Sequence, residues 1–221
     1  MDSSQFLAAY IVFLFSTTIF ITSPSLADPD PLQDFCVAKT TADLMIDGFP
    51  CKPISEVVPD DFFSAAISMA GDTNNMFGSN ITAANVLSFP AVNTLGISMN
   101  RVDIAPGGVN PLHTHPRATE IGFVVYGEVL VGFVSTSNVF YYKIIKAGMN
   151  FLIPRGLMHF ELNIGKEPAL EITAFNSQLP GTAVSSMTLF GSKPAIPDEV
   201  LAKTFQVDDN IVNLIKSKFG N

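Results

Sequence analysis

The strongest constraint on the fold is a series of short β-rich segments between residues 86 and 176, separated by Gly, Pro and Asn. The segments alternate apolar with polar or small residues, as half-buried strands do. No helical segment separates them, so neighbouring strands are expected to pair antiparallel and to pack as a sandwich or barrel. The expected strands are residues 95–103, 120–134 (two strands joined at Tyr126-Gly127-Glu128), 140–145, 150–153, 159–163 and 169–176. The sequence therefore predicts an all-β domain.

Helical character is confined to the tail and to one short turn at residues 60–66. Residues 198–205 follow Pro197 and begin with acids, and residues 208–219 begin with acids and end with lysines before Gly220. Acids first and lysines last suit the helix dipole, and glycine is a common helix stop. We therefore expect an N-terminal arm at residues 28–60, a barrel at about 61–190 and C-terminal helices at about 195–219.

The N-terminus has the pattern of an export signal. Residues 6–21 are apolar and uncharged, a Pro-Ser stretch follows, and Ser25-Leu26-Ala27 provides small residues for cleavage after Ala27. A membrane anchor is the alternative, but the apolar run of about 16 residues is shorter than the roughly 20 that a membrane-spanning helix needs. We therefore predict that residues 1–27 are a removed signal peptide, that the protein is secreted, and that the mature chain has no membrane partner.

Two later features, a cysteine pair and a glycosylation sequon, are also typical of secreted proteins. Cys36 and Cys51 are the only cysteines, and in an oxidising compartment an even, closely spaced pair indicates one disulfide. Asn80-Ile81-Thr82 is a sequon, which we expect on a loop as a glycosylation site.

The formal net charge of −8 and the lack of a basic cluster argue against a nucleic-acid partner.

The chain has three histidines, and all of them lie between residues 107 and 163. Alternate residues of a strand point to the same face, so His113 and His115 can both point inward. Glu120 follows shortly after, and His159 begins another expected strand that can lie beside the first pair. Three imidazoles and one carboxylate suit Mn, Fe, Zn, Ni or Cu and leave two positions of an octahedral ion open for water or substrate.

Two spaced motifs carry a resemblance to a known family. Residues 107–127 have the pattern G-x5-H-x-H-x4-E-x6-G of the first cupin motif, and residues 148–163 have the pattern G-x5-P-x-G-x2-H-x3-N of the second. The whole mature chain resembles plant germins and germin-like proteins. The most similar segments are DPDPLQDFCVA (28–38), NRVDIAPGGVNPLHTHPRATEIG (100–122), FLIPRGLMHF (151–160) and TLFGS (188–192).

The resemblance implies a single β-jelly-roll barrel with a short C-terminal helical region. It implies manganese as the cofactor, with His113, His115, Glu120 and His159 as its ligands, and it pairs Cys36 with Cys51. It further implies a secreted glycoprotein of the plant apoplast, related to defence or oxidative stress and associated with the cell wall. Germins assemble as hexamers, trimers of dimers in which the terminal helices pack between subunits, so a homo-oligomer is expected.

Three functions follow from the resemblance. The first is superoxide dismutase activity, supported by the complete ligand set and the open positions. The second is oxalate oxidase activity, in which residues matching Asn100 and Asn110 are thought to bind the oxalate carboxylates; an amide NH2 is a reasonable neutral donor to a carboxylate oxygen. Asn110 is also compatible with a turn before Pro111, and Asn100 with the end of a strand. The third is a non-enzymatic cell-wall or receptor-type protein with a structural metal.

Overall fold

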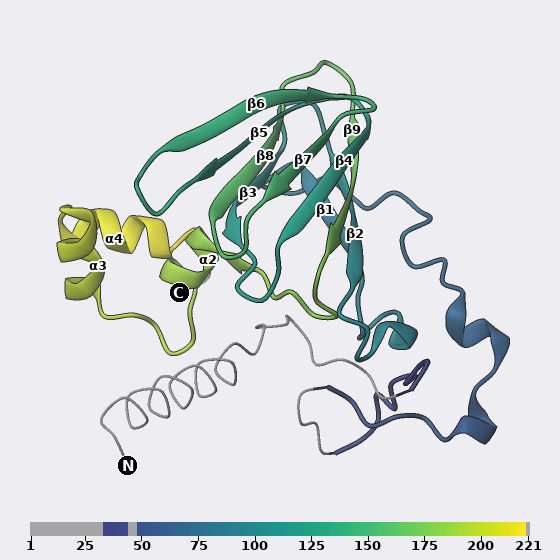
Figure 1. Cartoon of the computed structure of the whole chain (residues 1–221). Coiled ribbons are helices and arrows are strands. Elements are labelled where there is room, and N and C mark those ends of the chain that lie inside the picture. The colour runs from purple at the N-terminus through teal and green to yellow at the C-terminus, as the bar shows by residue number, and fades with distance from the viewer. Residues whose placement is uncertain (1–32, 44–47, 220–221) are drawn as a thin grey trace, which may run out of the picture.

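The computed structural model describes residues 33–43 and 48–219. These residues form two five-stranded antiparallel sheets, followed by short helices (Figure 1). The expected signal peptide, residues 1–27, lies outside the described residues. The strands are β1 (Ser79–Ala84), β2 (Ser98–Ile104), β3 (Val109–Thr114), β4 (Glu120–Tyr126), β5 (Glu128–Val134), β6 (Phe140–Lys146), β7 (Asn150–Ile153), β8 (Met158–Asn163), β9 (Ala169–Phe175) and β10 (Ala183–Val184). The helices are the 3-10 turns η1 (Ile54–Glu56), η2 (Pro59–Phe62) and η3 (Pro90–Val92), and α2 (Ser185–Phe190), α3 (Asp198–Phe205) and α4 (Asp209–Lys216).

Strands that are adjacent in sequence often belong to opposite sheets. One sheet has the order β1-β2-β9-β4-β7 and the other has the order β10-β3-β8-β5-β6. The chain passes from the first sheet to the second between β4 and β5 at Gly127, which has a φ of 95°. A Cβ at this position would lie 2.5 Å from the Cβ of Ala169, so glycine alone fits the passage. The predicted fold, an all-β jelly-roll barrel with a C-terminal helical region, is confirmed.

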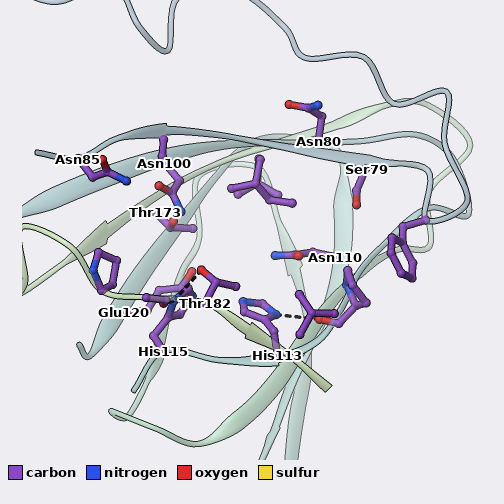
Figure 2. A pocket seen from close by; sticks show the side chains of 18 of the residues that line it. Ser79, Asn80, Asn85, Asn100, Asn110, His113, His115, Glu120, Thr173 and Thr182 are labelled. Carbon is purple, nitrogen blue, oxygen red and sulfur yellow. Dashed lines mark hydrogen bonds and ion pairs between the residues drawn. The ribbon is translucent and has the colours of Figure 1, made fainter. Parts of the chain in front are cut away.

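One local prediction is wrong. Asn80 does not lie on a loop but on β1, which pairs with β2 from Ser79 opposite Ile104 to Ala84 opposite Met99. The segment SNITAA has no clear alternation of apolar and polar residues, so its strand conformation comes from its partner strand rather than from its local pattern. The Asn80 side chain extends from β1 away from the histidines (Figure 2).

The inward faces of the strands divide the barrel into an apolar part and a polar part. On β8, the two-residue period buries three polar side chains in succession, His159, Glu161 and Asn163. On β9 the same period buries Glu171 and Thr173. The apolar part is formed by Val102, Ile104, Val124, Val129, Val131, Ile145, Ile153 and Ala169. The functional site is expected in the polar part, because buried polar side chains need partners.

A disulfide between Cys36 and Cys51 closes a loop within the N-terminal arm. Asn93, which is buried, donates hydrogen bonds from Nδ2 to Cys36 Sγ (3.4 Å) and to the backbone oxygen of Phe49 (2.8 Å). These contacts hold the arm against the segment between β1 and β2.

The C-terminal helices pack around Phe190 of α2, Leu201 of α3 and Val212 of α4. The Asp208 side chain caps α4 by accepting a hydrogen bond from the Ile211 nitrogen at 3.1 Å, as the acidic start of this segment predicts. Within residues 33–43 and 48–219, no helix has both the length and the apolar character needed to cross a membrane.

Candidate metal centre

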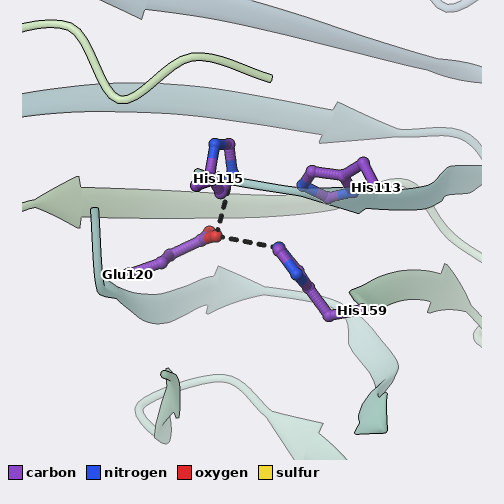
Figure 3. A group of neighbouring side chains, drawn as sticks. All are labelled: His113, His115, Glu120 and His159. Atoms are coloured by element: carbon purple, nitrogen blue, oxygen red, sulfur yellow. Dashed lines mark hydrogen bonds and ion pairs between the residues drawn. The ribbon is translucent and has the colours of Figure 1, made fainter. Parts of the chain in front are cut away.

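Four side chains from three strands and their ends converge inside the barrel. His113 of β3 lies directly opposite His159 of β8 in the strand register. His115 follows the end of β3, and Glu120 is the first residue of β4. All four are buried, and one potential ligand atom from each lies within 4.8 Å of the others (Figure 3). The structure therefore brings together the four residues that the spacing singled out.

Backbone carbonyls hold each imidazole in one orientation. The Nδ1 atoms lie 2.8 Å from the oxygen of Pro111 for His113, 2.6 Å from the oxygen of Gly181 for His115, and 2.8 Å from the oxygen of Leu157 for His159. A carbonyl oxygen only accepts hydrogen bonds, so each Nδ1 carries the proton and donates it. The Nε2 atom of each neutral ring then presents a lone pair to the centre of the group, which is the form that binds a metal.

The contacts inside the group require a positive charge. Glu120 Oε2 lies 3.2 Å from His115 Nε2 and 3.1 Å from His159 Nε2. With the protons on Nδ1, each of these contacts joins two electron-pair acceptors, which repel unless a proton or a cation lies between them. The donor set of imidazole nitrogens and a carboxylate oxygen therefore fits a transition-metal ion.

Two ligand pKa values are compatible with metal binding at neutral pH. Burial, together with repulsion from His159 and His115, lowers the pKa of His113 to about 3. Burial by itself would raise the pKa of Glu120, but contacts with His115 and His159 outweigh it and lower this pKa to about 2. Both side chains are therefore deprotonated at neutral pH, as metal ligands must be.

Three members of the group, His113, His115 and Glu120, line a cavity of about 560 Å³. Its wall combines apolar side chains, including Ile81, Leu179 and Met187, with the amides of Asn100 and Asn110 (Figure 2). Neither Lys nor Arg occurs among the described residues that line it. Asn110 is not at a free turn but on β3, where its Nδ2 donates a hydrogen bond to Glu161 Oε2 at 2.8 Å.

Three further polar residues near this group, Glu161, Glu171 and Thr173, are buried, and no motif in the sequence singles them out. Glu161 Oε1, both carboxyl oxygens of Glu171 and Thr173 Oγ1 are buried and have no hydrogen-bond partner within the described residues. Burial, with repulsion from Glu120, raises the pKa of Glu171 to about 8. Burial, with repulsion from Glu120 and Glu171, raises the pKa of Glu161 well above its usual range. Glu161 could have been found from its position two residues after His159, whereas the alternation in 169–176 does not reveal which face is inside.

Comparisons with known proteins agree with this fold and this site. A family model described as Cupin matches residues 65–213. Germin-like protein 3-8 of Oryza sativa subsp. japonica is 54% identical over 220 residues, which cover 96% of this chain and 98% of that protein. Oxalate oxidase 2 of Hordeum vulgare is 50% identical over 213 residues, which cover 95% of each chain. A solved oxalate oxidase in complex with the substrate analogue glycolate has a TM-score of 0.86 and 51% identity, covering 87% of this chain and 98% of that one.

The family model spans most of the chain, and the germin-like relative matches nearly all of it at more than half identity. The buried group of three histidines and one glutamate lies inside the matched region. The chain therefore belongs to the germin-like proteins of the cupin family.

Proposed function

We propose that the protein is a secreted manganese germin-like protein that converts superoxide to oxygen and hydrogen peroxide. One observation carries this proposal: a buried group of three histidines and one glutamate, of which His113, His115 and Glu120 line a cavity. Superoxide is small and carries a single negative charge, so it needs no cationic side chain on the wall once a metal cation occupies the group. The cavity wall provides none among the described residues.

Manganese would be held by the Nε2 atoms of His113, His115 and His159 and by the carboxylate of Glu120. Bound there, manganese supplies reversible one-electron chemistry between its +2 and +3 states. The backbone carbonyls fix the orientation of the three imidazoles, so that each Nε2 is aimed at the ion, and apolar side chains cover part of the cavity wall. Nitrogen and carboxylate ligands are compatible with manganese, and the oxalate oxidase relatives add support for a redox-active metal.

Oxalate oxidase is the second candidate function. It is supported by the relatives that bear this name and by Asn100 and Asn110 on the cavity wall, where their amides can donate to a carboxylate. One contact disfavours it: Asn110 Nδ2 already donates to Glu161, which leaves one of its two N–H groups for a carboxylate of oxalate. We therefore place oxalate oxidation after superoxide dismutation.

One set of assays on a single purified sample tests both functions. Metal content, superoxide consumption and oxalate-dependent peroxide production are measured for the wild type and for the His113→Ala and Glu120→Gln variants. Glu199→Gln is the matched control for Glu120→Gln, because Glu199 is an exposed acid on α3. Superoxide consumption that is lost in both site variants and kept in the control supports the proposal. Wild-type protein with bound manganese that consumes superoxide no faster than His113→Ala refutes it.

We further propose that the chain is exported to the apoplast and functions there in defence or oxidative stress, in contact with the cell wall. The predicted signal peptide at residues 1–27, the disulfide and the sequon at Asn80 support this. N-terminal sequencing of the exported protein should begin at Asp28, and Asn80→Gln should remove one glycan from its mass. We also propose a hexamer, a trimer of dimers, which light scattering of the purified protein tests.

A further inference from the structure

A fully buried carboxyl group lies within the barrel, on the same face of β9 as a residue that lines the metal cavity. Glu171 is 0% exposed, and neither of its oxygens has a hydrogen-bond partner within the described residues. It points to the interior from β9, and its neighbours across the sheet are Val102 of β2 and Val124 of β4. An ionised carboxylate is very costly in such apolar surroundings unless a positive charge compensates it.

The strands around Glu171 supply no such charge. The inward titratable groups are Glu120 on β4, His159 and Glu161 on β8, His113 on β3 and His115 just after β3. Two of these are acids, and the imidazoles of His115 and His159 are paired with Glu120 rather than with Glu171. On β2, Arg101 is paired with Asp103 at 2.8 Å. Within the described residues, a bound proton is therefore what keeps Glu171 neutral, and its raised pKa agrees with this.

We propose that Glu171 holds an exchangeable proton and delivers it to the metal cavity through the hydroxyl of Thr173. Thr173 lies two residues from Glu171 on the same face of β9 and lines the cavity. Its buried Oγ1 has no hydrogen-bond partner within the described residues, and a hydroxyl both accepts and donates a proton. Alternate residues of a strand are about 7 Å apart, so an internal water would bridge the two side chains.

The role as a proton donor rests on the proposed function, and both candidate reactions need it. Two superoxide ions and two protons give one O2 and one H2O2, so one superoxide is oxidised and the other is reduced. Oxalate, O2 and two protons give two CO2 and one H2O2, so oxalate is oxidised and O2 is reduced. The metal ligands are poor sources of these protons, because Glu120 is ionised at neutral pH and the Nδ1 protons are held by carbonyls.

Infrared spectroscopy tests the stored proton without any turnover. A protonated carboxyl group has a C=O stretching band that a carboxylate lacks. Ordinary Asp and Glu side chains are ionised above about pH 6 and therefore do not show this band at pH 7. We expect the full-length mature protein to keep such a band at pH 7, both metal-free and manganese-loaded. The band should decrease in Glu171→Gln and remain in the Glu199→Gln control. A wild-type spectrum without the band at pH 7, or a band unchanged in Glu171→Gln, overturns the proposal.

Exchange into D2O tests the route. The part of the band that Glu171→Gln removes belongs to Glu171, and it shifts when the carboxyl proton is replaced by deuterium. We expect the exchange of this part to be slower in Thr173→Val, which keeps the shape of the side chain and removes the hydroxyl. Equal exchange rates in the wild type and in Thr173→Val overturn the route. In active protein, Glu171→Gln should lower turnover by roughly 100-fold at unchanged metal content. Both infrared results with an inactive wild type would refute the proposed function and still support the proton site.

Discussion

The raised pKa of Glu171 predicts an unusual dependence of stability on pH. The ordinary pKa of a glutamate here is 4.5, and in the folded chain that of Glu171 is about 8. Between these two pH values the folded protein keeps a proton that the unfolded chain releases. The free energy of unfolding therefore decreases as the pH rises from about 4.5 to about 8. Glutamine does not titrate, so the Glu171→Gln variant lacks this loss.

The size of the effect follows from the same two values. Each pKa unit is worth about 1.4 kcal/mol, so at pH 7 the wild type has lost about 3 kcal/mol through Glu171 relative to pH 4.5. Substitution by glutamine nearly conserves the shape of the side chain and should leave the packing around Val102 and Val124 unchanged. We therefore expect the stability advantage of Glu171→Gln to grow by about 3 kcal/mol over this range.

The assay is thermal unfolding of metal-free protein at several pH values between 4.5 and 7.5, at constant salt and protein concentration. For a chain of this size, about 3 kcal/mol corresponds to a change of roughly 6–12 °C in the difference between the two Tm values. Glu199→Gln serves as the control, and its difference from the wild type should not vary with pH in this way. A Tm difference between Glu171→Gln and the wild type that stays constant with pH would contradict the raised pKa.

Three further predictions concern the site and the scaffold. His159→Ala should lower metal affinity by about 100-fold or more in a chelator competition, and unchanged affinity would argue against this ligand. Replacing Cys36 and Cys51 by serine opens a loop with a sequence separation of 15 and should lower the free energy of unfolding in urea by about 3 kcal/mol. Asn163→Ala removes hydrogen bonds to the backbone of Ile104, Gly165 and Glu167 and should cost about 2–4 kcal/mol in the same assay. A loss below about 1 kcal/mol in either urea experiment would contradict the corresponding role.

Local patterns predicted most of the strands and the tail helices. The expected strand at 150–153 is β7, and the expected helix at 198–205 is α3. Both could be predicted because apolar–polar alternation in a strand, and proline and acids at the start of a helix, are signals contained within one segment. The pairing of strands depends on segments that are distant in the sequence, so local patterns do not predict it. Nothing within residues 120–134 indicates that β4 and β5 belong to different sheets, and β1 becomes a strand only through β2.

The candidate site shows the same division between local and distant information. The two motifs placed His113, His115, Glu120 and His159 in one group because their spacing is local to two segments, and the structure brings these four together. The places of Asn100 and Asn110 on the cavity wall agree with the resemblance, and their role in substrate binding stays a prediction. Glu171 could not be recognised as a buried acid from the sequence, because the inward face of β9 is set by its neighbours β2 and β4.

The acceptors behind the three histidines are main-chain oxygens, and this limits how the centre can diverge. A substitution changes a side chain but leaves the carbonyl of Pro111, Leu157 or Gly181 in place. Chains that share this backbone therefore inherit the same imidazole tautomers, whatever their surrounding residues. New activities on this scaffold must then arise from the cavity wall and the buried acids, while the geometry of the metal-binding group is passed on with the fold.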